Sequence, residues 1–208
     1  MRSITITQAL TELKLYDSKI RKSLSDSEFV GAEKTKLNKI GHITKDEFAD
    51  KAKSDYQSVC DLITNRAVIK SKIAESNAKT YVTVNDIKMS VAEAIERKNS
   101  VVYEQLFLNE MKNQFSKATQ LMNKKNTEVD LQITKMLEIM VGKDASSSTL
   151  ADREATEKIY RENNEFSLVD PIDIVNKIET LQEKIDGFLS NVDVTLSVSN
   201  AVTFIEVN

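Results

Sequence analysis

The chain has 208 residues, of which 40% are hydrophobic, 29% charged and 6% aromatic. Its net charge of −3 gives the chain as a whole no electrostatic reason to bind nucleic acid or an anionic membrane. The single cysteine, Cys60, excludes an intrachain disulfide and fits a reducing compartment. The amino terminus lacks the apolar core of a signal peptide, and no window approaches the roughly 18 apolar residues of a membrane span. We therefore expect a soluble protein.

Residues that end helices are rare in this sequence. Only four glycines and one proline, Pro171, are present. Glycine and proline terminate helices because the glycine backbone has too much conformational freedom and proline lacks a main-chain N–H donor. The composition therefore predicts long, uninterrupted helices.

The first predicted helix covers about residues 6–25. Thr5 and Gln8 have the spacing of a capping box, in which each side chain satisfies a free main-chain N–H at the start of a helix. Positions at spacings of three and four then mark one helix face, on which only Asp17 is polar: Leu10, Leu13, Asp17, Ile20 and Leu24. Residues 26–43 contain Gly31 and Gly41 and few periodic apolar positions, so we predict a loop there.

A second helix is predicted from Thr44 to about residue 75. Thr44 and Glu47 repeat the capping-box spacing. One apolar stripe follows: Phe48, Ala52, Tyr56, Val59, Ile63, Ala67 and Ile73. The helix is expected to end at residues 76–78, and the β-forming residues beyond it flank the turn pair Asn85-Asp86. This pattern predicts a β-hairpin over about 79–89.

The third helix is predicted over about 91–140, a stretch with neither glycine nor proline. Ser90 and Glu93 supply a third capping box. The apolar stripe is recurrent but imperfect: Ala94, Ile95, Val102, Leu106, Met111, Phe115, Ala118, Met122, Val129, Ile133, Met136 and Met140. Unbroken, such a helix reaches about 75 Å at 1.5 Å per residue. The alternative is a break near residues 123–126, which would give two antiparallel helices.

The sequence after this helix alternates between breaks and helical patterns. Residues 142–149 are small and polar, and we expect them to be flexible. A short polar helix over about 150–164 and a strand over 166–169 follow. Asp170 with Pro171 predicts a helix start, with the carboxylate as the N-cap and the proline in the first turn.

The last twenty residues fit two patterns. Val192, Val194, Leu196 and Val198 alternate as in a strand, although Leu189, Val192 and Leu196 also continue a helical stripe. We predict a helix to about residue 199 and a terminal strand at about 202–207, paired with the hairpin because two strands alone are marginal in water. The predicted fold is therefore mainly α. It is a long-helix bundle in a single domain, 1–208, with a small antiparallel β-sheet appendage.

Few residues offer chemistry. His42 lies in a glycine-flanked loop, where a solvated side chain is the simplest interpretation and a base or metal ligand the alternative. Cys60 adjoins the apolar stripe of the second helix and is expected to pack as a small hydrophobe. Gly142-Lys143 lacks the other positions of a phosphate-binding loop, because residues 137 and 144 are Leu and Asp. We predict no catalytic, cofactor-binding or metal-binding residues.

Lysines cluster at two places without the features of a nucleic-acid site. The clusters are Lys34, Lys36, Lys39 and Lys45, and the pair Lys124-Lys125. Acidic residues interleave with the first cluster, and the aromatic spacing that would stack bases is missing. Methionines 111, 122, 136 and 140 lie on or near the helical stripe and are expected in helix–helix contacts. Neither nucleic acid nor a small-molecule substrate is expected as a partner.

Two short segments carry a resemblance to known proteins. They are Ser76-Asn77-Ala78-Lys79-Thr80-Tyr81-Val82 and Val91-Ala92-Glu93-Ala94-Ile95-Glu96-Arg97-Lys98. They resemble the septicolysin-like family of small bacterial helical proteins, and still more the virion-associated proteins of tailed bacteriophages. The element order agrees over most of the chain, including the Gln8–Leu13 helix, the Val169-Asp170 helix start and the Asn200-x-x-Thr203 strand. The motifs are short and carry no chemistry.

The resemblance implies a structural role in a phage particle, assembled in the host cytoplasm. On this hypothesis the protein is not an enzyme, and it oligomerises or docks on other virion proteins through long helical faces. The first alternative is a cytoplasmic helical protein of the septicolysin-like type with a toxin-like or stress-related role. Another is an enzyme with unrecognised carboxylate chemistry. An uncovered apolar stripe on the helix over 91–140 would favour self-association.

Overall fold

The computed structural model describes residues 2–32, 38–143 and 150–207, with the side chains of 141–143 left aside. The contacts of the chain divide it into two compact units, each described by itself: Met1–Asn99 with Gly187–Asn208, and Ser100–Asp186. Helices make up well over half of the described residues, and every sheet is a two-stranded antiparallel pair. The predicted mainly α fold with a small β-element is confirmed.

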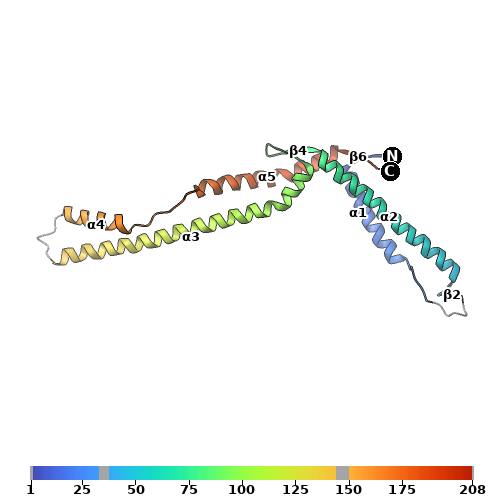
Figure 1. The fold of residues 1–208 in the computed structure, drawn as a ribbon, viewed down its shortest axis with the longest axis horizontal. Coiled ribbons are helices and arrows are strands. Elements are labelled where there is room, and N and C mark those ends of the chain that lie inside the picture. Colours follow the sequence, from blue (N-terminus) through green and yellow to red (C-terminus); the bar gives the residue numbers. More distant parts are fainter. Residues whose placement is uncertain (1, 33–37, 144–149, 208) are drawn as a thin grey trace. The chain divides into compact units, whose positions relative to one another are not determined.

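Two long helices, α1 (Ile6–Asp26) and α2 (Lys45–Lys79), lie side by side in the first unit (Figure 1). Both capping boxes are present, with Thr5 and Thr44 as the N-caps. Helix α2 continues past its predicted end at residues 76–78, because Ser, Asn and Ala do not block a helix. It ends where the extended residue Thr80 donates its N–H to the Ser76 carbonyl over 2.9 Å.

The α1–α2 pair is joined by an apolar core and an ion pair. The core consists of buried residues from both helices and from the terminal strands: Ile4, Ile6, Ala9, Leu13, Ile69, Ile73, Ile205 and Val207. Asp17, the one polar position of the predicted α1 stripe, accepts a hydrogen bond from the Arg66 guanidinium of α2. Of the apolar residues of the predicted stripe, only Leu13 is buried, whereas Leu10 and Leu24 are exposed.

The terminal strand is β6 (Phe204–Val207), but its predicted partner was wrong. It pairs with β1 (Arg2–Thr5), an unpredicted strand at the amino terminus, with Ile4 opposite Ile205. The Ile6 N–H donates to the Thr203 carbonyl over 2.9 Å and extends this pairing to the start of α1. Burial of Ile4 and Ile205 in the α1–α2 core explains why β6 joins β1 and not the hairpin.

The predicted loop after α1 contains one small element of regular structure. Strands β2 (Lys39–Ile40) and β3 (Ile43–Thr44), each of two residues, form a small hairpin directly before α2. Gly41 has φ +62°, a value that a glycine adopts without strain, so it permits this tight turn. Strands of two residues are too short to leave a periodic signal in the sequence.

The predicted hairpin at about 79–89 is confirmed as β4 (Tyr81–Val84) and β5 (Ile87–Ser90). Asn85 and Asp86 both have positive φ, as a two-residue hairpin turn requires. Buried residues of the hairpin, of the first turn of α3 (Val91–Lys143) and of α5 (Ile174–Val202) form a second core: Val84, Met89, Ala94, Phe188 and Val192. The Arg97 guanidinium stacks on the Phe188 ring at 4.2 Å.

Helix α3 is continuous over its 53 residues, so no break occurs at residues 123–126. Its part in the second unit, Ser100–Lys143, spans about 66 Å at 1.5 Å per residue. Within the second unit, α5 and α4 (Leu150–Asn164) run along it (Figure 1), joined by the ion pairs Lys184–Glu104 at 3.2 Å and Arg161–Asp130 at 2.8 Å. The predicted helix over 150–164 is confirmed.

The predicted strand at 166–169 does not form. The Asn126 side chain accepts a hydrogen bond from the Phe166 N–H at 2.8 Å and donates one to the Phe166 carbonyl at 2.9 Å. An asparagine amide thus takes the place of a strand partner, and the segment runs alongside α3 without regular structure. Asn126, which lies in the stretch where a break in α3 was the alternative, therefore binds this segment to the helix.

Helix α5 begins later than predicted. Asp170 accepts hydrogen bonds from the N–H of Ile172 and Ile174, but Pro171 lies in a turn before the helix. Asp173, with φ +56°, separates this turn from the first helical residue, Ile174. The region over 190–199 is helical, as predicted. Gly142 and Lys143 end α3, whereas the rest of the stretch predicted to be flexible, 144–149, lies outside the described residues.

The Asp17–Arg66 pair predicts a pH dependence of stability. The Arg66 hydrogen bond holds the pKa of the Asp17 carboxyl below its usual value. A lowered folded-state pKa adds stability above the unfolded pKa, and this stability is lost as the pH falls through the folded value. We expect Asp17→Asn to lower the melting temperature at neutral pH and to differ less from wild type at about pH 3. Thermal unfolding followed by circular dichroism measures both, and an equal difference at the two pH values would contradict the assignment.

Gly187 of α5 predicts a coupled pair of substitutions. A Cβ at Gly187 would lie 2.4 Å from the Asn85 side-chain nitrogen at the hairpin tip. Gly187→Ala should therefore gain less than the about 1 kcal/mol by which alanine exceeds glycine in a helix, because the exposed Asn85 side chain must turn aside. In an Asn85→Gly background, where the side chain is gone and positive φ is tolerated, the same substitution should stabilise by the full amount. Urea denaturation of the four proteins measures this difference, and equal effects in both backgrounds would contradict it.

Candidate interaction surface

Helix α3 is apolar on two faces over Val101–Leu108. Val101, Leu108 and, one turn on, Met111 are buried on the side where α5 packs. Val102 and Leu106, which were predicted on the same buried stripe, are 44% and 60% exposed. At 101–102 and again at 106–108, apolar residues are adjacent in the sequence, so each of the two helix faces receives one of them. Only the position of α5 decides which face becomes the core.

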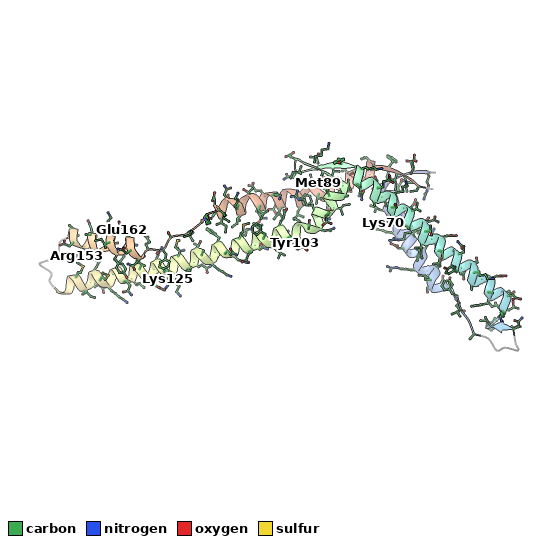
Figure 2. All side chains as sticks on the ribbon, viewed as in Figure 1. Lys70, Met89, Tyr103, Lys125, Arg153 and Glu162 are labelled. Carbon is green, nitrogen blue, oxygen red and sulfur yellow. The ribbon has the colours of Figure 1, made fainter. Side chains whose placement is uncertain are left out.

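The exposed side of this segment is a compact apolar patch. It consists of Val102, Tyr103, Leu106 and Phe107, here called the α3 patch, with Tyr103 71% and Phe107 60% exposed. Residues four apart stack on one face of a helix, so the four side chains form two adjacent columns one turn long. Figure 2 shows Tyr103 on this part of α3.

The α3 patch is free of charge. Between Ser100 and Asn109 the only charged residue is Glu104, and it forms an ion pair with Lys184 of α5. Lys112, further along, donates to Gln182 of α5 at 2.8 Å. The nearest charged residues on the patch side are Lys98, one turn before Val102 and paired with Asp193, and Glu110, which accepts a hydrogen bond from Gln114. The patch therefore offers apolar and aromatic surface without a charge that would have to be desolvated.

A second exposed apolar stripe lies in the first unit, on α5. Val194, Val198 and Val202 are spaced by four residues and are 58–67% exposed. The neighbouring Asp193 is paired with Lys98. Valine side chains present less area than the two aromatic rings of the α3 patch, so this stripe is the weaker candidate.

A shallow groove lies between α3 and the segment before α5 that runs alongside it in the second unit. It has a volume of about 260 Å³ and is lined by Gln114, Phe115, Ala118, Ile174 and residues 168–172. The carboxylate of Asp170 in its wall already accepts helix N–H groups. Its lining is otherwise mostly apolar and holds no second titratable group that would act on a substrate.

The two residues considered for chemistry lie apart. His42 is exposed in the β2–β3 turn, before the start of α2 at Lys45. Cys60 lies on α2, about 22 Å along the axis from Lys45 at 1.5 Å per residue. A histidine base and a cysteine nucleophile must be within hydrogen-bond distance, so these two cannot act together.

Cys60 is half-buried and contacts Tyr56, the residue one turn earlier. A hydrogen bond with Cys60 is the main cause that raises the pKa of the Tyr56 hydroxyl. This contact differs from the purely apolar packing expected for Cys60.

Among the described residues, no group of three or more histidine, cysteine, aspartate or glutamate side chains could hold a metal ion. No helix in this part of the chain has an apolar window long enough to cross a bilayer. Of the first lysine cluster, Lys39 and Lys45 are described, whereas Lys34 and Lys36 lie outside the described residues.

Comparison of the chain with protein-family models, with curated proteins and with solved structures gives no match. The comparisons therefore add no functional residues to those found from the sequence and the structure.

The α3 patch was only half recognised from the sequence, because Val102 and Leu106 were assigned to the core and Tyr103 and Phe107 were not singled out. The available signal was the adjacent apolar residues at 101–103 and 106–108. A helix with one buried face places such neighbours about 100° apart, so one of each group must be exposed.

The exposure of His42 predicts a small effect of its removal. We expect His42→Ala to change the free energy of unfolding by no more than about 0.5 kcal/mol, as for surface positions outside caps and cores. Urea denaturation measures this, with the half-buried Cys60→Ser as a comparison. A loss of several times this size would show that the β2–β3 turn depends on the imidazole.

Proposed function

We propose that the protein is a non-enzymatic structural and interaction protein of a bacteriophage particle or of its assembly. It acts through the outer faces of its long helices. The observation that carries the interaction role is the α3 patch, with two aromatic and two aliphatic side chains exposed side by side. Contiguous exposed apolar surface of this kind usually marks a contact with another molecule.

The placement of the candidate chemical groups supports a role without catalysis. His42 and Cys60 are separated, and the groove beside Asp170 contains a carboxylate already engaged by main-chain donors. A general acid or base needs a free proton-transfer position beside a bound substrate. Neither location offers this arrangement.

The assignment to a virion rests on the resemblance of the segments around Ser76–Val82 and Val91–Lys98 to virion-associated proteins of tailed phages. In the structure these segments form the end of α2 with β4, and the start of α3. They contribute Ala94, the partly buried Val82 and the Arg97 guanidinium to the second apolar core around Phe188. On this proposal the motif residues shape the fold, and the uncovered helix faces make the contacts.

The proposal predicts that the protein is found in purified particles. We expect quantitative mass spectrometry of gradient-purified virions, from a host lysate carrying the gene, to detect this chain in a fixed ratio to the major capsid protein. Capsid, portal and tail genes should also adjoin its gene. Recovery of the chain only in the soluble host fraction, with none in particles or assembly intermediates, would contradict the proposal.

A further inference from the structure

We propose that the α3 patch is a homodimer contact in which it pairs antiparallel with the same patch of a second copy. The inference rests on the proposed interaction function and adds the surface and the partner. It starts from Val102, Tyr103, Leu106 and Phe107, which are exposed although they lie within the most apolar segment of α3. The opposite face of this segment is already occupied by α5, through Glu104–Lys184 and Lys112–Gln182.

The four positions are self-complementary under a two-fold axis. Two identical helices that pair antiparallel about an axis between Glu104 and Gln105 place residues equidistant from that axis opposite each other. Tyr103 then meets Leu106 of the second copy, and Val102 meets Phe107. Each large ring is placed against a smaller aliphatic side chain, the alternation that lets facing helices interlock.

The absence of charge favours a second copy over a charged partner. Two copies of a surface that carried even one charge near its centre would bring like charges together and desolvate them. The α3 patch has none at its centre, because Glu104 is turned to Lys184, while Lys98, paired with Asp193, and Glu110 lie one turn beyond its two ends. Antiparallel pairing keeps the two Glu110 carboxylates at opposite ends of the contact.

The exposed area fits a weak dimer. Side chains of this size with the observed exposure contribute about 400 Å² of apolar surface per copy, within the range of patches that are often functional. A standard stable interface buries about 800 Å² per partner. The patch supplies about half of this, so the remainder must come from its polar rim. We expect dissociation at roughly micromolar concentrations, where one rim or patch substitution has a measurable effect.

Sedimentation velocity of the full-length chain over a concentration series around the micromolar range tests the pairing. We expect a monomer–dimer equilibrium for wild type. Leu106→Lys should weaken it at least tenfold. The matched control is Leu131→Lys, on the same helix with 56% exposure against 60% for Leu106 but outside the patch, and it should leave the equilibrium unchanged. Circular dichroism melting should show both variants folded.

The register is tested by complementary charges. Tyr103→Glu and Leu106→Lys should each be monomeric alone, but an equimolar mixture should form heterodimers because the new glutamate faces the new lysine. The double variant Tyr103→Glu with Leu106→Lys should dimerise for the same reason. Disruption by the single variants without rescue in the mixture would overturn the antiparallel register.

Two further outcomes decide between the inference and the function on which it depends. A wild-type monomer throughout the series, or equal weakening by Leu106→Lys and Leu131→Lys, would overturn the dimer contact. If the chain is nevertheless found in virions, the proposed function stands and the patch binds another protein there. Dimers of a chain that is absent from particles would instead support the contact and contradict the virion role.

Discussion

The structure depends on how the apolar surface of a helix of 53 residues is covered. Helix α3 is nearly twice as long as α5, which has 29 residues, and α4 adds only 15. The inner face of α3 in the second unit is buried by α5 at Leu108 and lined by α4 at Ile133. Because both partners lie on one side, the apolar residues on the other side at 102–107 stay exposed. The candidate interaction surface follows from this one-sided covering.

In the first unit, capping boxes and strand pairs fix the ends of the helices. Each helix start there is fixed by a capping box, and the ends of the chain are joined through β1 and β6. The tip of hairpin β4–β5 lies on α5 at Gly187, where an added Cβ would touch the Asn85 side chain. These contacts fix the ends of the helices and strands of the first unit.

Elements with a local signal were predicted and the others were not. The three capping boxes and the Asn85-Asp86 turn depend on residues within four positions of each other, so their positions were found from the sequence. The partner of β6 was wrong because the choice of β1 depends on a core built from residues about 200 positions apart in the chain. The strand predicted at 166–169 failed for a similar reason, since Asn126 is forty residues away. The α3 patch belongs to this second group, because the position of α5 alone determines which apolar face is exposed.

We propose that the outer face of α3 at Val102–Phe107 contacts another molecule in the working state. Hydroxyl-radical footprinting read by mass spectrometry tests this on the wild-type chain, in dilute solution and in the assembled state. Oxidation of Tyr103 and Phe107 should fall on assembly, while exposed Tyr56 on α2 stays reactive and buried Met111 stays protected in both states. Equal oxidation of Tyr103 in the dilute and assembled states would contradict it.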